Sequence, residues 1–141
     1  MTPNSPFNVN TELDSRFPSG RWHGWWRQDL QRGKMELDLT FARGRIFGDG
    51  RDSVGDFVFS GSYCALAGTC ALLKSYLGQH DVDYDGIAAA DGIRGTWSLR
   101  DRETKKVVDT GSFHIWPVQH GAMTIQHLIE ELPLPMEAVP N

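Results

Sequence analysis

Apolar and polar residues alternate along most of the chain between positions 21 and 116. The stretch 35–41 reads MELDLTF, in which every second residue is apolar, and the stretches 57–63 and 93–99 repeat this period. A period of two places the apolar residues on one face of an extended chain, so the pattern predicts half-buried β-strands.

Glycine-containing turns separate these strands, among them Arg43-Gly44, Gly78-Gln79 and Asp91-Gly92. We predict eight strands, at 21–28, 34–42, 45–49, 56–64, 70–77, 80–89, 93–100 and 107–116. The connections are short and sequential, which indicates a meander, and closing the meander removes its two unpaired edges. The predicted fold is therefore all-β, an eight-stranded antiparallel up-and-down β-barrel with a short C-terminal helix.

The turns also predict which side chains point inward. An Asp91-Gly92 hairpin pairs Gly86 with Trp97 and keeps Tyr84 on the same apolar face.

The hairpin at Gly78 allows two registers. A two-residue turn puts Ser75 on the inner face together with His80, and this is the register we expect. A three-residue loop over 77–79 is the alternative, and it would turn Lys74 and Tyr76 toward the face of His80.

The two ends of the chain differ from the middle. Residues 1–19 are rich in proline and small polar residues and predict a flexible arm, whereas residues 20–117 form the barrel domain. In the segment 118–141, apolar residues recur at helical spacing and predict a short helix and a tail; they are Ile125, Leu128, Ile129 and Leu132. This helix packs on the barrel or docks on a second copy or another partner.

Composition excludes several classes of protein. The chain has 141 residues, of which 40% are hydrophobic, and a net charge of -4. It therefore resembles neither a disordered chain nor a coiled coil, and it offers no electrostatic case for binding nucleic acid or a membrane. We find no secretory signal pattern and expect a cytoplasmic location. The two cysteines, Cys64 and Cys70, are too few for a disulfide scaffold; reduced thiols are expected and a bridge is the alternative.

The segment Gly20-Arg21-Trp22-His23-Gly24 has the form G-x-W-x-G. With the eight-strand meander, this motif resembles the opening of calycin-like barrels, namely the lipocalin, fatty-acid-binding and avidin group, and superficially the nitrobindins. The resemblance implies a ligand-binding barrel without enzymatic activity, and it leaves the ligand open.

The predicted interior is rich in aromatic residues and includes a few polar groups, which is typical of a small-molecule pocket. We expect a small apolar or aromatic ligand to bind there without a covalent bond. The candidate binding residues are His80, Tyr84, Ser75, Tyr63, Trp97, Trp26 and Phe59. The alternative is that these side chains simply fill the core, in which case the protein is an interaction or assembly module, with a homodimer as one form. A third hypothesis is an isomerase or cyclase that uses His80 as its acid-base group.

Other chemistries find weaker support. The stretch 81–86 reads DVDYDG, the first half of a calcium loop, but the glutamate that should close the loop is missing. No metal ligand set, catalytic set or haem histidine can be assigned, so we expect no cofactor. In the polar loop 48–56, Arg51, Asp52 and Asp56 form either a charged lid over one barrel mouth or part of a flexible connection.

Overall fold

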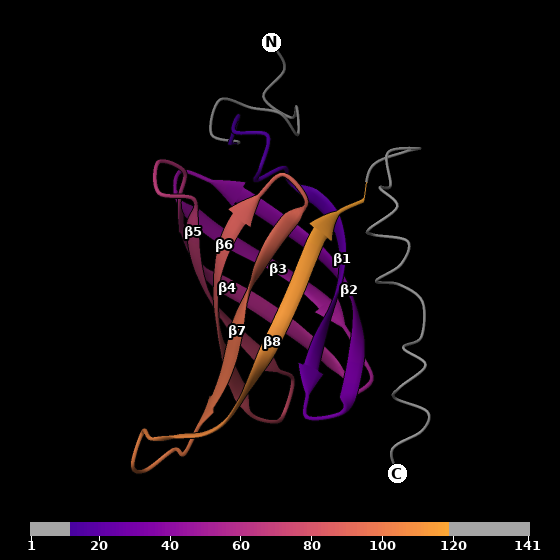
Figure 1. Ribbon diagram of the computed structural model, residues 1–141, viewed down its shortest axis with the longest axis vertical. Coiled ribbons are helices and arrows are strands. Elements are labelled where there is room, and N and C mark those ends of the chain that lie inside the picture. Colours follow the sequence, from indigo (N-terminus) through magenta and orange to yellow (C-terminus); the bar gives the residue numbers. More distant parts are fainter. Residues whose placement is uncertain (1–11, 119–141) are drawn as a thin grey trace.

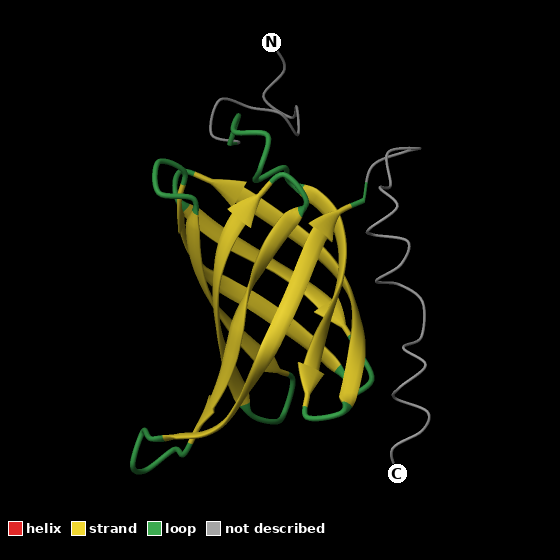
Figure 2. Ribbon diagram, in the orientation of Figure 1, coloured by secondary structure: helices red, strands yellow, loops and turns green. Residues whose placement is uncertain are grey.

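The computed structural model describes residues 12–118. Eight antiparallel strands in sequence order close into a barrel, so the predicted fold class is confirmed (Figures 1 and 2). The strands are β1 (Gly20–Gln28), β2 (Gln31–Ala42), β3 (Arg45–Arg51), β4 (Asp56–Cys64), β5 (Thr69–Tyr76), β6 (Asp81–Ala89), β7 (Gly92–Arg100) and β8 (Val107–Pro117). The predicted C-terminal helix lies outside the described residues.

The turn between β2 and β3 forms at the predicted residues, Arg43 and Gly44. Ala42 pairs with Arg45, and the two residues between them, Arg43 and Gly44, have φ angles of 51° and 78°. Two consecutive positive φ angles are typical of the tight turns that suit a twisted hairpin. The residues that alternate along β2 accordingly point into the barrel as expected, from Met35 to Phe41.

The register of β5 against β6 differs from the one we expected. Lys74 pairs with Val82, and the amide of Tyr76 donates a hydrogen bond to the carbonyl of His80 across the loop 77–79. The three-residue loop is therefore formed, and it shifts the strand by one residue. Such a shift exchanges the two faces of a strand. Lys74 and Tyr76 consequently point into the barrel, and Ser75 lies on the outer face.

The hairpin of β6 and β7 is displaced by two residues relative to the prediction. Ala89 pairs with Gly92, so the turn residues are Ala90 and Asp91. A shift of two preserves the faces, and Tyr84 and Trp97 both stay inside, where they are direct cross-strand partners.

Residues 12–19 cover one end of the barrel, which we call the capped end (Figure 1, top). The ring of Phe17 is fully buried and lies 4.8 Å from the ring of Tyr63 and 5.6 Å from that of Phe41. The Tyr63 hydroxyl donates a hydrogen bond of 2.6 Å to Glu12 Oε1, and the Trp22 indole donates one of 2.9 Å to the Pro18 carbonyl. Residues 12–19 of the expected arm thus contact the end of the barrel, with Phe17 inserted into its core.

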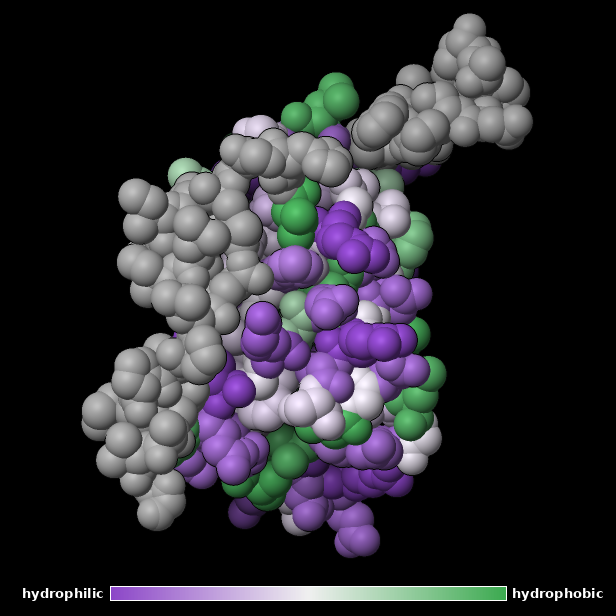
Figure 3. All heavy atoms as spheres, turned by 90° about the vertical axis from the view of Figure 1, so that its right-hand side faces the viewer, coloured by the Kyte–Doolittle hydropathy of each residue, from purple (hydrophilic) through white to green (hydrophobic). Residues whose placement is uncertain are grey.

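The outer surface carries the polar side chains of the alternating pattern. On the side shown in Figure 3, hydrophilic residues prevail and apolar residues are scattered among them. Asp81, Asp83 and Asp85 lie outward on β6, and Asp83 accepts a hydrogen bond of 3.3 Å from Arg100. In the described part of the chain, no helix is long and apolar enough to cross a membrane.

The two cysteines are not bridged. Cys64 is exposed, whereas Cys70 points into the barrel, where burial raises the pKa of its thiol to about 12. A thiol with such a pKa stays protonated at neutral pH and is a poor nucleophile.

Candidate functional site

A hollow of about 90 Å³ lies at the end of the barrel opposite the cap, which we call the open end. Its lining is mostly aromatic and aliphatic, with a few polar groups. The lining residues are Trp26, Gln28, Val54, Tyr76, His80, Val82, Tyr84, Trp97 and Leu99. An apolar hollow with a few polar groups is the usual form of a small-molecule site.

Glycines on neighbouring strands position the two indoles of the hollow. A Cβ atom at Gly33 would come within 2.2 Å of the Trp26 ring, and one at Gly111 within 2.5 Å of Trp97 Nε1. Each indole therefore lies across a glycine of the adjacent strand. Trp97 is held further by a hydrogen bond of 2.9 Å from its Nε1 to the Arg27 carbonyl.

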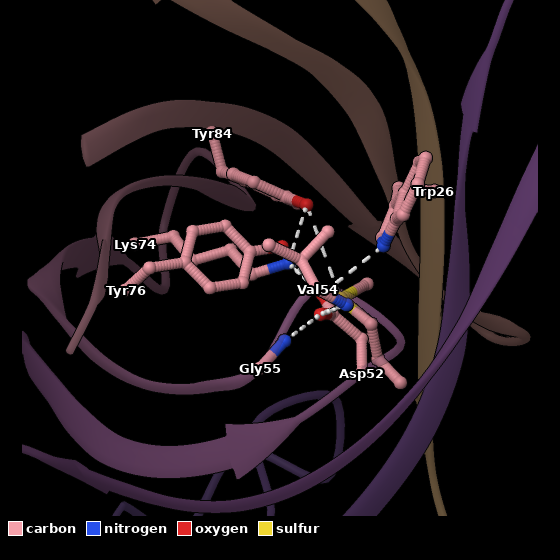
Figure 4. Close-up of polar contacts among 8 residues, drawn as sticks. Trp26, Asp52, Val54, Gly55, Lys74, Tyr76 and Tyr84 are labelled. Carbon is pink, nitrogen blue, oxygen red and sulfur yellow. Dashed lines mark hydrogen bonds and ion pairs between the residues drawn. The ribbon is translucent and has the colours of Figure 1, made fainter. Parts of the chain in front are cut away.

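Residues that line the hollow also contact a buried ion pair, Asp52–Lys74 (Figure 4). Asp52 comes from the loop between β3 and β4, and its Oδ2 atom accepts three hydrogen bonds. The donors are Lys74 Nζ at 2.7 Å, the Tyr76 hydroxyl at 2.5 Å and Trp26 Nε1 at 3.1 Å. The side chain of Asp52 has 0% of its surface exposed and that of Lys74 has 1%, so water screens neither charge.

Aromatic rings complete the surroundings of Lys74. Its Nζ atom lies 4.2 Å from the ring centroid of Phe57, 4.8 Å from that of Tyr76 and 5.3 Å from that of Tyr84. The same atom is 3.3 Å from the Tyr84 hydroxyl and 3.4 Å from the sulfur of Met35. Ring faces attract a cation, and this attraction is stronger where water is excluded.

The loop 52–55 is folded so that Asp52 reaches inward. Asp52 Oδ1 accepts hydrogen bonds from the amides of Val54 at 2.9 Å and Gly55 at 3.3 Å. Oδ1 thus accepts hydrogen bonds from the loop itself, and Oδ2 accepts them from side chains inside the barrel. Of the two sequence hypotheses for this segment, Asp52 fits a charged group at the barrel mouth, whereas Arg51 and Asp56 form an exposed pair with 3.8 Å between them.

The pKa values of the pair reflect burial and mutual attraction. Burial lowers the pKa of Lys74 to about 8, and the Asp52 carboxylate opposes this shift. Burial alone would raise the pKa of Asp52, but the Lys74 charge and the hydrogen bonds from Lys74 and Tyr76 outweigh it and keep the pKa below its usual value. Burial also raises the pKa of both Tyr76 and Tyr84, so these phenols stay protonated and can donate hydrogen bonds.

The structure brings four of the seven predicted binding residues together at the hollow, namely Trp26, His80, Tyr84 and Trp97. His80 is exposed and its ring centroid lies 5.1 Å from that of Tyr76.

The other three predicted residues lie elsewhere. Phe59 is deeper in the core, where its ring packs edge-on against Tyr84 at 5.3 Å. Tyr63 belongs to the capped end, and Ser75 is on the outer face because of the one-residue shift of β5.

Sequence reasoning did not include Lys74 and Tyr76 in the site. The alternative three-residue loop at 77–79 was the signal that would have placed them inside. Hydrophobicity argues against that register, because it turns a lysine into the barrel.

Comparison with known proteins assigns the chain to no family. No family model matches it, and neither the curated proteins nor the solved structures gave a significant match. The resemblance to calycin-like barrels is confirmed in architecture only, as a closed eight-stranded meander. Within the G-x-W-x-G segment, Trp22 is fully buried and Gly24 lies where a Cβ would meet the carbonyl of His114 at 2.3 Å. Packing where β1 meets β8 is therefore enough to explain why Trp22 and Gly24 occupy these positions.

Proposed function

We propose that the protein binds a small molecule with an apolar or aromatic group at the open end of the barrel, without a covalent bond. The observation that supports this most is the placement of an aromatic hollow beside a set of inward-pointing donors, Lys74, Tyr76 and Trp26. Burying two charges costs several kcal/mol of desolvation unless they are well paired, and natural cores rarely include them. Buried ionisable groups beside a hollow therefore favour a functional site.

The size of the hollow limits the ligand. At about 90 Å³ it is smaller than the cavity of roughly 150 Å³ that accommodates a benzene ring in a protein core. A single ring would therefore enter only partly and would remain in contact with the rim, where His80 and Val54 are exposed to solvent. Long-chain lipids do not fit this hollow in the described conformation.

Nuclear magnetic resonance of the ¹⁵N-labelled protein tests the proposal with benzamide, a neutral single-ring probe. We expect the indole N–H signals of Trp26 and Trp97 to shift on titration, while that of Trp22 at the capped end stays in place. Absence of any shift at millimolar benzamide, or an equal shift of Trp22, would overturn the proposal.

The substitution His80→Ala removes the ring that packs on Tyr76 at the rim. Aromatic contacts contribute about 0.5–1.5 kcal/mol, so benzamide affinity is expected to fall roughly two- to twelvefold. Ser75→Ala, on the outer face of β5, is the matched control and is expected to leave affinity unchanged. An equal loss in both variants would show that the rim does not contact the ring.

A second candidate function is self-association through the outer face of β3, β4 and β5. Phe47 and Leu73 both pair with Ser60 across neighbouring strands, and Val58 lies two residues away on β4. These three apolar side chains are 53%, 37% and 41% exposed, respectively. Native mass spectrometry is expected to show a dimer that Leu73→Lys dissociates. A monomer at micromolar wild-type protein would contradict this candidate.

A further inference from the structure

The buried donors at the open end form an anion-binding site whose present occupant is a carboxylate of the chain itself. Three donors from two strands, Trp26 on β1 and Lys74 and Tyr76 on β5, converge on one oxygen atom, Asp52 Oδ2. Asp52 is the only part of this arrangement that comes from a loop and not from a strand. The three donors, which we call the receptor, lie on strands of the barrel wall. The carboxylate that they bind belongs to the loop 52–55.

The same residues link this receptor to the hollow. Trp26 and Tyr76 donate to the carboxylate and also line the hollow. Tyr84 lines the hollow as well, and its hydroxyl accepts a hydrogen bond of 3.3 Å from Lys74 Nζ. Val54 lies between the two spaces, since it lines the hollow and follows Asp52 by two residues. Outward movement of the loop 52–55 would therefore join the hollow to the receptor and leave one cationic group, two hydroxyls and an indole N–H facing the combined space.

We infer that the ligand of this site is a small aromatic monocarboxylate, which binds with its carboxylate in the place of the Asp52 carboxylate and its ring in the hollow. This inference rests on the proposed function and adds the charge and chemical class of the ligand. The exchange replaces one carboxylate by another, so Lys74 keeps its counter-charge and Tyr76 and Trp26 keep their acceptor. The Asp52 side chain and the amides of Val54 and Gly55 then bind water.

Charge also selects against other ligand classes. A neutral amide that displaced Asp52 would leave the buried Lys74 cation without a counter-charge. A cationic ligand would be repelled by Lys74. A dianion such as phosphate would bring a second negative charge into an aromatic surrounding that offers one cation.

Benzoate and benzamide test the inference, because they have the same shape and differ in charge. In the variant Asp52→Ala the internal competitor is absent. If the Asp52 carboxylate fills the receptor for at least nine-tenths of the time, it lowers the apparent affinity of the wild type for benzoate about tenfold or more. Benzoate is therefore expected to bind at least tenfold more tightly to the variant than to the wild type. Benzamide affinity is expected to change less than threefold. Asp56→Ala removes an exposed carboxylate at the start of β4, directly after the same loop, and is the matched control.

A second measurement covers the case in which Asp52→Ala is poorly folded. Benzoate is expected to raise the unfolding temperature of this variant more than that of the wild type, because it restores the missing counter-charge of Lys74. In the wild type, benzoate is expected to shift the amide signals of Val54 and Gly55, which lose their hydrogen bonds to Asp52 on displacement.

The outcomes separate the two proposals. Benzamide binding at the hollow without any gain for benzoate in Asp52→Ala would overturn the carboxylate inference and leave the proposed function standing. Failure of both probes to bind either protein would overturn both. A benzoate gain that Asp56→Ala shares would also overturn the inference, since it would reflect net charge alone.

Discussion

The substitution Lys74→Met is expected to lower the free energy of unfolding by about 3–5 kcal/mol at pH 7, because it leaves the Asp52 carboxylate buried without its counter-charge. Methionine has a similar length and keeps the contacts with the rings of Phe57 and Tyr84, so the loss of packing is small. Unfolding in guanidinium chloride, followed by tryptophan fluorescence, measures the change.

The matched control is Arg100→Met, which breaks the pair between Arg100 and Asp83 on the outer surface. These side chains are 51% and 44% exposed, and the atoms lie 3.3 Å apart. Exposed pairs contribute about 0–1 kcal/mol, so this variant is expected to lose less than 1 kcal/mol. Equal losses in the two variants would show that the Asp52–Lys74 pair is solvated in solution.

The dependence on pH gives the first prediction a second signature. In the wild type the pKa of Asp52 lies below its ordinary value of 3.8, so its contribution to stability is present above that value and is lost as the pH falls through the folded-state pKa. In Lys74→Met the unpaired carboxylate instead has a raised pKa and can escape the cost of burial by binding a proton. The loss of stability is therefore expected to be smaller at pH 5 than at pH 8.

Lys74 contributes in the alkaline range. Its pKa of about 8 in the folded protein is below its ordinary value of 10.5, so between these values the unfolded chain binds more protons than the folded one. The stability of the wild type is therefore expected to receive a positive contribution from this group as the pH rises through that window, and Lys74→Met lacks this contribution.

The fold follows from information that is local in sequence. The period of two along β2, together with the Arg43-Gly44 turn, determines both the strand and its partner, because each turn residue adopts the positive φ that the hairpin needs. The hairpin at Gly78 is less determined by its sequence. Gly78 has a φ of 74°, which glycine adopts readily in turns of different length, so both loop lengths satisfy the local chemistry.

The interior charge could not be read from the same pattern. Hydrophobicity places Lys74 outside, and what makes its inward position acceptable is Asp52, which is 22 residues away in a loop. Contacts between a strand and a distant loop have no signature in local alternation. The aromatic part of the site, with Trp26, Tyr84 and Trp97, was predictable because it depends on strand faces alone.

The cap is the second feature that local pattern did not reveal, and Phe17→Ala tests its contribution. Phe17 is fully buried, with 0% of its surface exposed to solvent, and it contacts the rings of Phe41 and Tyr63. Removing a buried phenylalanine ring costs about 3–5 kcal/mol, through lost burial and the cavity that remains. We expect this loss in the free energy of unfolding measured with guanidinium chloride.

Leu13→Ala is the control within the same segment, since Leu13 is 95% exposed and its truncation is expected to cost less than about 0.5 kcal/mol. Because Phe17 lies at the capped end, Phe17→Ala is also expected to leave the affinity of the open end for benzamide unchanged under conditions in which the variant is folded. A loss no larger than that of Leu13→Ala would mean that residues 12–19 do not unfold together with the barrel. A large loss in the free energy of unfolding with unchanged benzamide affinity would show that the capped end contributes to stability without contributing to binding at the open end.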